Sequence, residues 1–270
     1  MKQVRSSPNR YEWNLKQMRN NPRKHRLPPF EKSGIILVNK PADWTSHDVV
    51  SFIRARFNVP KAGHCGTLDP AATGLLVVVI GKFTKLSQKF SGEDKTYEGT
   101  ILLGTVTDSQ DLDGEVIQQN DWSAITPERL EEGFMNFLGD IEQVPPMVSA
   151  VKKDGKRLYA LAREGIEVER EAKPVTIESI KLTRIELPYA DFVVKCSKGT
   201  YIRTLCSDVG ELLGCGACLS RLNRIQSGEF ELAEAVTIDE MKTWDQAQLA
   251  DYVDHYLHTR IQKIQKFSDF

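Results

Sequence analysis

The stretch GHCGTLDPAATGLL, residues 63–76, holds a single carboxylate, Asp69, between a polar turn and a run of aliphatic residues. One interpretation is structural: Asp is a favoured helix N-cap, Pro70 fits the first helical position, and Gly74 would end a single helical turn. The other is chemical: a carboxylate can attack as a nucleophile or support the charge that develops when a bond breaks. Residues 63–76 alone leave both interpretations open.

Other reactive side chains form no comparable motif. The five cysteines are an odd number without the spacing of a disulfide framework, which indicates reduced thiols. Cys215 and Cys218 have the spacing of half a zinc site, but structural zinc requires four ligands and no second cysteine pair accompanies them. We therefore interpret residues 214–218 as a tight turn at a helix end. The sequence also lacks a glycine-rich phosphate motif, which disfavours a nucleotide cofactor.

The composition is that of a soluble globular protein. Of 270 residues, 40% are hydrophobic and 27% are charged, a length that suffices for one large domain or two small ones. The longest apolar run, Leu75–Ile80, is far shorter than the roughly 20 residues needed to span a bilayer. The amino terminus is polar and has no signal-peptide pattern. We expect no membrane contact and a cytoplasmic location.

Charge is distributed unevenly along the chain. The net charge is −1, yet residues 1–33 contain nine Lys or Arg against two Glu. A basic segment with few aliphatic residues is expected to be flexible when alone. Such segments often bind nucleic-acid phosphates, and a solvated tail without a partner is the alternative. The pattern predicts a basic, flexible N-terminal extension and leaves its partner open.

The elements that would position Asp69 follow from hydrophobic patterning, because helices and strands repeat their apolar residues with different periods. The predicted strands are residues 35–39, 75–80, 96–103, 175–186 and 191–197, and the predicted helices are residues 47–57, 84–90, 126–138, 156–165 and 201–214. The apolar stripe of the helix predicted at 126–138 includes Leu138, and that of the helix predicted at 201–214 includes Leu212. Strands and helices follow one another without a regular βαβ rhythm, which favours an α+β fold.

Five stretches resemble, in the same order, the TruB family of pseudouridine synthases. The Asp69 stretch is similar to the family's catalytic motif of His, a small residue, Gly-Thr-Leu-Asp-Pro and Thr-Gly-Leu. The others are NKPADWTSHDVV, DKTYEGTILLGTVTDSQDLDGEV, the segment from GDIEQVPP to EAKPV, and CSKGTYIRTLCSDVGELLGCGA. Together the five stretches cover approximately residues 34–230.

The resemblance implies an isomerase that converts the uridine at position 55, in the T-loop of tRNA, to pseudouridine. The base would be detached from its ribose at nitrogen, turned, and reattached through carbon, without a metal or organic cofactor. It also implies an α+β, pseudouridine synthase-like catalytic domain around a central, mainly antiparallel mixed sheet with flanking helices. We expect tRNA as the partner, a monomer, and no protein partner.

Three residues match the family's catalytic positions. Asp69 matches the catalytic aspartate, which we expect to act as the nucleophile. Arg203 in GTYIRT matches the arginine that pairs with this aspartate, and a guanidinium fork would hold the carboxylate ionised and oriented. Tyr97 in DKTYEG matches the tyrosine that stacks on the target base, where an aromatic face replaces lost stacking worth roughly 1–3 kcal/mol.

Five further residues match positions that contact RNA. His64 matches the histidine that wedges into the T-loop beside the flipped base, and Tyr201 and Leu222 match residues that line the uracil pocket. Lys40 and Lys85 fall where family members place lysines that contact the RNA backbone. For these two lysines a solvated surface charge remains an alternative.

The sequence departs from the family's pattern at its C-terminus. Bacterial members commonly carry a small PUA-type RNA-binding domain there, whereas the residues after Phe230 have helical patterning. We expect residues 1–33 to form the basic extension, residues 34–235 the catalytic domain, and residues 236–270 a helical segment without a PUA domain. The extension would then supply part of the phosphate binding of the missing module.

Two other classes of function remain open. The first is an RNA-binding or RNA-folding protein, against which the complete set of Asp69, Tyr97 and Arg203 argues. The second is a glycoside-cleaving hydrolase that uses Asp69. That chemistry generally needs a second carboxylate as the acid, and none lies in a comparable motif.

Overall fold

The computed structural model describes residues 27–147, 152–153, 156–157, 166 and 168–264. The contacts divide the chain into two compact units: the first comprises Met1–Ser91 and Phe230–Phe270, and the second comprises Gly92–Glu229. Each unit combines a sheet with helices, and among the described strands that pair within a unit, only β1 and β14 run parallel. The predicted α+β fold with mainly antiparallel, mixed strand pairing is therefore confirmed.

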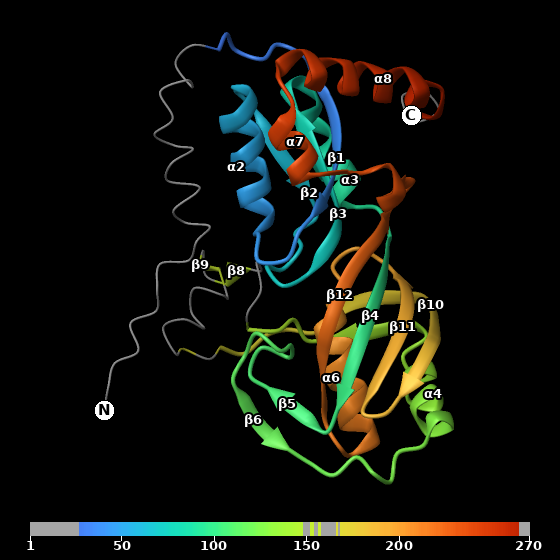
Figure 1. Cartoon of the computed structure of the whole chain (residues 1–270). Helices are drawn as coiled ribbons and strands as arrows, with labels where there is room; N and C mark the ends of the chain where they lie inside the picture. Colours follow the sequence, from blue (N-terminus) through green and yellow to red (C-terminus); the bar gives the residue numbers. More distant parts are fainter. Residues whose placement is uncertain (1–26, 148–151, 154–155, 158–165, 167, 265–270) are drawn as a thin grey trace, which may run out of the picture. The chain divides into compact units, whose positions relative to one another are not determined.

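The first unit contains the strand that follows Asp69 (Figure 1). Its strands are β1 (Gly34–Lys40), β2 (Ala62–Cys65), β3 (Thr73–Ile80), β13 (Phe230–Glu231) and β14 (Val236–Thr237). Its helices are α2 (Ser46–Phe57), α3 (Ser87–Ser91), α7 (Ile238–Thr243) and α8 (Gln246–Ile264), with short 3₁₀ helices at Gly81–Leu86 and Leu232–Glu234. The strands predicted at 35–39 and 75–80 and the helix predicted at 47–57 are confirmed.

Strand β3 lies between β1 and β2 in this unit. Val78 of β3 is opposite Ile36 of β1 on one side and His64 of β2 on the other, both antiparallel. Both faces of the β1–β3 pair are buried: alternate residues pack with α2, α7 and α8, and the others with a cluster that includes Phe90 and Phe230. Burial on both faces explains why LLVVVI is an uninterrupted apolar run.

Helix α2 begins at a capping box. The Thr45 hydroxyl accepts a hydrogen bond from the Asp48 N–H at 3.0 Å, and the Asp48 carboxylate accepts one from the Thr45 N–H at 2.9 Å. The two bonds satisfy N–H groups that a helix start would otherwise leave without partners. The cap therefore fixes the place where the chain turns from β1 into α2.

The second unit contains the remaining elements (Figure 1). Its strands are β4 (Lys95–Leu103), β5 (Thr105–Thr107), β6 (Val116–Gln119), β7 (Gly139–Gln143), β8 (Lys152–Lys153), β9 (Lys156–Arg157), β10 (Lys173–Glu186), β11 (Tyr189–Cys196) and β12 (Ala217–Ser227). Its described helices are α4 (Pro127–Met135) and α6 (Ile202–Leu213). Strands β4, β10 and β11 confirm the three strands predicted there.

An antiparallel sheet in the order β12-β4-β11-β10-β7 organises the second unit. Helix α6 packs against β12, and α4 packs against α6 and β10 (Figure 1). Gly99 of β4 permits the close approach of Phe192 from β11, since a Cβ at position 99 would lie 2.4 Å from Phe192 Cζ. Phe192 in turn packs on Phe134 of α4, with ring centroids 5.2 Å apart. The helix-covered face is therefore the core of this unit.

The structure corrects the ends of two predicted helices. Helix α4 ends at Met135, so Leu138 lies beyond it and is 48% exposed, because Gly139 begins β7 and the chain must turn before it. In α6, Leu213 is buried and Leu212 is 53% exposed. A stripe can continue from Val209 at either i+3 or i+4, and the packing of α6 selects i+4.

No helix follows Asp69. The Ala72 N–H donates to the Asp69 carbonyl at 3.2 Å, which closes a β-turn with Pro70 at its second position. Strand β3 then begins at Thr73, and Gly74 lies within it with φ 101°. Pairing with β1 therefore overrides the local helical signal. The interpretation of Asp69 as a helix cap was wrong.

Two other predicted segments fall partly or wholly outside the described residues. In the helix predicted at 156–165, Lys156–Arg157 instead form β9, paired antiparallel with β8, and the remaining residues are not described. The basic extension is described only from residue 27 onward. By contrast, the tight turn predicted at 214–218 is confirmed: Gly214 and Gly216 have φ 81° and 70°, and the Gly216 N–H donates to the Gly210 carbonyl at 2.8 Å.

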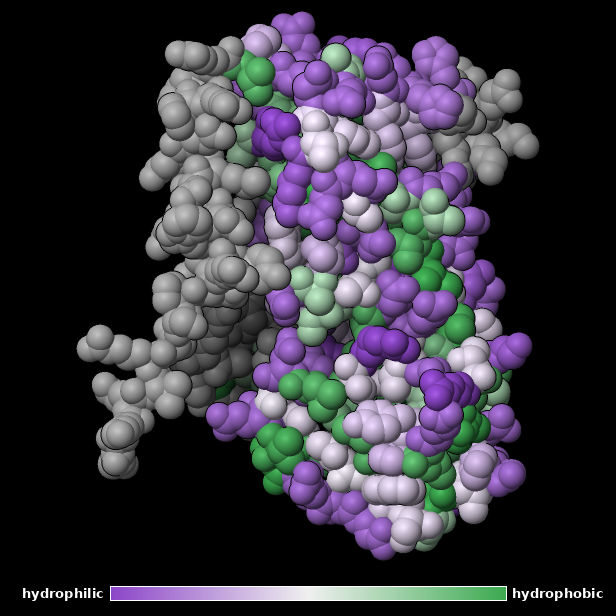
Figure 2. Space-filling view, viewed as in Figure 1, coloured by the Kyte–Doolittle hydropathy of each residue, from purple (hydrophilic) through white to green (hydrophobic). Residues whose placement is uncertain are grey.

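The surface of the second unit includes apolar side chains on β6. Val116 and Ile117 are 55% and 65% exposed, and hydrophobic residues are visible in this region of Figure 2. Strand β6 pairs with β5 in a two-stranded sheet, and its four residues are exposed, so it contributes little to the core. Among the described helices, none has both the length and the apolarity needed to cross a membrane.

Asp208 in α6 predicts a pH dependence of stability. Burial and, secondarily, the Glu211 carboxylate raise the pKa of Asp208 to about 6 from its ordinary value of 3.8. The folded state therefore binds this proton more tightly than the unfolded state, and stability is lost as the pH rises from about 4 to about 6. We expect Asp208→Asn to raise the free energy of unfolding at pH 7.5 by about 1 kcal/mol after allowance for solvent screening, and the melting temperature by about 2 °C.

Thermal melts of this variant at pH 7.5 and pH 4.5 check the prediction. The gain should fall to about a third at pH 4.5, because Asp208 is then protonated in the folded state while most of the unfolded state is still ionised. Asp251→Asn, at an exposed position in α8, is the control and should change stability little at either pH. An equal gain at both pH values would contradict the assigned cause.

Candidate active site

The structure distributes the candidate site residues over its two units. The first unit contains Lys40, His64, Asp69 and Lys85, and the second contains Tyr97, Tyr201, Arg203 and Leu222. Each unit thus supplies its own set of side chains. The predicted pairing of Asp69 with Arg203 joins residues of different units and stays a prediction.

Asp69 lies in the connection between β2 and β3, at the first position of the β-turn that leads into β3. Its side chain is half-buried. A short turn between two paired strands is a rigid place for a carboxylate. Here β2 and β3 pair with each other, and β3 also pairs with β1. The turn itself is held by residues that come from β1 and from the start of α2.

The ammonium of Lys40 is the first of these contacts. Lys40 is completely buried, and its Nζ donates to the carbonyls of Pro41, Trp44 and Pro70 at 2.9, 2.6 and 3.0 Å. Pro70 directly follows Asp69. A buried cation is tolerated only where hydrogen bonds compensate for its lost hydration, and these carbonyls do so. Contact with an RNA backbone does not fit this position, so the structure corrects the role that was predicted for Lys40.

The hydroxyl of Ser46 forms the second contact. Ser46 is buried, its Oγ donates to the Leu68 carbonyl at 3.1 Å, and the same Oγ accepts from the Leu68 N–H at 2.9 Å. On the other side of Asp69, the Asp43 N–H donates to the Pro70 carbonyl at 2.9 Å. The backbone is therefore held immediately before and immediately after Asp69.

His64 and Lys85 occupy different environments in the same unit. His64 is half-buried in β2, opposite Val78. Lys85 is exposed in the 3₁₀ helix Gly81–Leu86. An exposed lysine can reach a phosphate at little desolvation cost, so Lys85 remains compatible with the backbone contact predicted for it.

Arg203 is buried at the start of α6 and is held by the loop after β5. Its Nη1 donates to the Ser109 carbonyl at 2.9 Å, and its Nε lies 3.4 Å from Oδ2 of Asp111. The side chains of Arg203 and Asp111 are only 4% and 15% exposed. An ion pair with so little solvent contact, together with the hydrogen bond to the Ser109 carbonyl, fixes the guanidinium in place. Arg203 is therefore not a solvated surface arginine.

Tyr97 lies on the helix-covered face of β4. It is 8% exposed, with Val194 of β11 and Arg224 of β12 opposite it. Lys95, two residues earlier on the same face, is also buried, and burial together with the charge of Arg224 lowers the pKa of Lys95 to about 8. Two cationic side chains thus accompany Tyr97 in the interior of this unit.

Tyr201 and Leu222 also belong to the second unit. Tyr201 is the N-cap residue of α6, two positions before Arg203. Leu222 of β12 is opposite Gly99 of β4 and is 9% exposed. The second unit therefore brings an aromatic residue, an aliphatic residue and the buried Arg203 to the α6 side of its sheet.

In the part of the chain that the structure describes, other nucleophiles and metal ligands form no competing site. Burial raises the pKa of Cys196 to about 12 and that of Cys218 to about 11, so these thiols stay protonated at neutral pH. All five cysteines are buried and free of disulfides. No group of three or more His, Cys, Asp or Glu suited to a metal ion occurs among the described residues.

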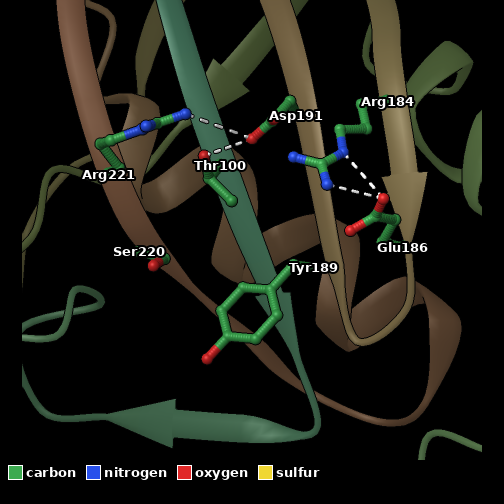
Figure 3. Close-up of a pocket in the computed structure, with 7 residues that line it drawn as sticks. All are labelled: Thr100, Arg184, Glu186, Tyr189, Asp191, Ser220 and Arg221. Carbon is green, nitrogen blue, oxygen red and sulfur yellow. Dashed lines mark hydrogen bonds and ion pairs between the residues drawn. The ribbon is translucent and has the colours of Figure 1, made fainter.

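A surface pocket of the second unit, about 350 Å³ in volume, lies away from these residues (Figure 3). Its lining residues are Thr100, Arg184, Glu186, Tyr189, Asp191, Ser220 and Arg221. Thr100 and Tyr97 are three residues apart on β4 and therefore point to opposite faces of the sheet. The charged groups of the pocket pair with one another, Asp191 with Arg221 and Arg184 with Glu186. Asp191 also accepts a hydrogen bond from the Thr100 hydroxyl. We therefore do not assign the chemistry to this pocket.

Sequence reasoning missed Asp111 and Ser46. The stretch DSQDLDG contains three aspartates, and nothing in their spacing distinguishes Asp111. The bridge between Asp111 and Leu219 of β12 brings Asp111 to Arg203, a long-range contact that no local signal reveals. Ser46 directly precedes the helix predicted at 47–57, and its hydroxyl bonds to the backbone of Leu68, 22 residues away.

Three curated proteins that are similar to this chain carry the same name. The tRNA pseudouridine synthase B of Opitutus terrae is 50% identical over 212 residues, which are 78% of this chain and 88% of that protein. The protein of the same name from Symbiobacterium thermophilum is 49% identical over 214 residues, 78% of this chain and 72% of that protein. That from Alkaliphilus oremlandii is 45% identical over 216 residues, 80% and 72% of the two chains.

Solved structures with a similar fold include chains of two multi-component complexes. A chain of a Cbf5-Nop10-Gar1 complex is 29% identical with a TM-score of 0.61, and the match covers 87% of this chain and 57% of that one. A chain of an H/ACA RNP bound to a substrate RNA containing 2′-deoxyuridine is 27% identical with a TM-score of 0.57, covering 86% and 56%. This chain thus spans a little more than half the length of those solved chains.

Family models cover most of the sequence. Residues 54–202, which include Asp69, Tyr97 and Tyr201, match the N-terminal domain of the TruB family of pseudouridylate synthases. Residues 203–262, which begin at Arg203, match the C-terminal domain of tRNA pseudouridylate synthase B. The chain therefore belongs to the TruB family of pseudouridine synthases.

Proposed function

We propose that this protein isomerises the uridine at position 55, in the T-loop of tRNA, to pseudouridine, with Asp69 as the catalytic nucleophile. Relatives that share 45–50% of their residues with it are named tRNA pseudouridine synthase B, and this similarity supports tRNA as the substrate. The observation that carries the assignment of Asp69 is its position on a turn held on both sides by buried polar contacts.

The reaction rearranges one bond and needs no co-reactant. The bond between N1 of uracil and C1′ of the ribose breaks, the base turns, and a bond forms between C5 and C1′. The proton on C5 leaves to solvent, and N1 gains a proton, so the product is an isomer of the substrate. A carboxylate held in place suits this chemistry, because it can attack the nucleoside and later leave.

The second unit would recognise the base. Tyr97 offers an aromatic face on which a flipped uracil can stack, and Tyr201 and Leu222 would line its pocket. Arg203 would hold the Asp69 carboxylate, with Asp111 fixing the guanidinium. The same proposal includes wedging of the T-loop by His64 and phosphate contact by Lys85. It also includes action as a monomer and a cytoplasmic location.

Asp69→Asn tests the nucleophile. Asn has nearly the same shape as Asp but supplies neither the charge nor the nucleophilicity, so we expect the rate to fall by at least about 10³-fold. Tritium release from tRNA labelled at C5 of uridine measures the rate, and thermal melting and tRNA binding should be unchanged. Arg203→Met should also slow turnover, and less than additively when Asp69 is already replaced.

An Asp69→Asn protein that released tritium at nearly the wild-type rate would contradict the proposal. The same assay separates the other function classes. A glycoside-cleaving hydrolase would leave abasic RNA, and a protein that only binds RNA would give neither product.

Lys40→Met and Lys85→Met test the corrected role of Lys40 against a matched surface lysine. Replacing Lys40 removes a buried cation from three carbonyls, and we expect a loss of roughly 3 kcal/mol in unfolding free energy together with slower turnover. Replacing Lys85 should leave stability unchanged and reduce the slope of log affinity against log salt by about 1. Chemical denaturation and tRNA titrations at several salt concentrations give both quantities.

The loss of stability should thus be confined to Lys40→Met, and the lower salt slope to Lys85→Met. If Lys40→Met kept full stability and lowered the salt slope as Lys85→Met does, Lys40 would be a phosphate contact after all.

A further inference from the structure

Gln143, the last residue of β7, holds the backbone of Tyr201 with two hydrogen bonds. Its Nε2 donates to the Tyr201 carbonyl at 3.0 Å, and its Oε1 accepts from the Tyr201 N–H at 2.7 Å. The side chain is buried, with 2% exposure. A primary amide carries a donor and an acceptor side by side, so it pairs with a peptide backbone as a neighbouring strand would.

Tyr201 is the residue from which α6 starts. Its side chain forms no cap hydrogen bond, and its carbonyl accepts the first bond of the helix, from the Leu205 N–H at 3.0 Å. The carbonyl that Gln143 binds is therefore the same one that begins the helical ladder. By holding it, Gln143 sets the direction in which the first turn of α6, with Arg203, leaves the loop.

We propose that Gln143 is a positioning residue for the pseudouridine synthase reaction, acting through the backbone of Tyr201 on the placement of Arg203 and of the Tyr201 ring. The proposal rests on the function proposed above. Arg203 is bound at its far end by Ser109 and Asp111, so its guanidinium is placed correctly only if the helix start is too. A displacement of about 1 Å at a reacting group can cost on the order of 100-fold in rate.

The opposite end of α6 provides a matched control. Asn120 Nδ2 donates to the Cys215 carbonyl at 2.9 Å, just after the Gly214 cap that ends the helix. Gln143 and Asn120 are both amides bonded to the backbone at an end of the same helix. They differ in that only Gln143 lies at the end that carries Arg203.

The experiment compares Gln143→Met with Asn120→Leu, which remove the amides and keep similar volumes. Single-turnover tritium release from C5-labelled tRNA should fall on the order of 10- to 100-fold in Gln143→Met and less than about 3-fold in Asn120→Leu. Both variants should melt a few degrees lower, and tRNA Kd should change less than about 3-fold in either. Rates are measured well below both melting temperatures, so loss of folded protein does not enter.

Gln143→Glu gives a readout that a merely structural role would not move, and it covers the case in which Gln143→Met fails to fold. An ionised carboxylate accepts from the Tyr201 N–H but cannot donate to the carbonyl, whereas a protonated one does both. Burial raises the pKa of such a group. The rate of Gln143→Glu relative to wild type should therefore be low at pH 8.5 and rise as the pH falls to 6.

A single-turnover rate of Gln143→Met equal to that of Asn120→Leu would overturn the proposal, and so would a ratio for Gln143→Glu that does not depend on pH. In both cases an active wild-type protein would leave the proposed function standing. If the wild-type protein released no tritium from tRNA, the proposed function would fail and the role of Gln143 would fail with it.

Discussion

The contact on which the Asp69 turn depends is the buried ammonium of Lys40. A fully buried cation is costly unless its hydrogen bonds are satisfied, and three carbonyls from two separate loops converge on this one. The ammonium joins the turn between β1 and α2 to the residue after Asp69. Because those loops have few regular hydrogen bonds, their geometry comes from this cation, from Ser46, and from the Asp43 N–H.

In the second unit, neutral groups and one ion pair hold Arg203 and the backbone that precedes it. Gln143 holds the backbone before Arg203, and Asp111 and the Ser109 carbonyl hold the guanidinium. In both units, then, the proposed catalytic residue lies next to a loop. A buried polar side chain holds the backbone of that loop in place of regular backbone hydrogen bonds. Such support is what a reaction needs when it depends on the placement of a few atoms.

The regular elements could be predicted from sequence because their signals are local. The apolar run LLVVVI and the Thr45 cap of α2 each specify their element without reference to distant residues. The turn at Asp69 could not, since an Asp-Pro pair fits a helix start as well as a β-turn, and pairing of β3 with β1 decides between them. Family resemblance identified the candidate residues, yet it gave Lys40 a surface role that its burial contradicts. Asp111 and Gln143 act through partners about 60 to 90 residues away along the chain, so no spacing in the sequence points to them.

The proposed reaction rearranges one particular uridine of tRNA. The most direct measurement uses tRNA with tritium at C5 of uridine 55 alone and follows both tritium release and the integrity of the strand. We expect release of one tritium per tRNA, with the strand intact and pseudouridine at that position. Retention of the label at uridine 55, or release accompanied by an abasic site, would contradict it.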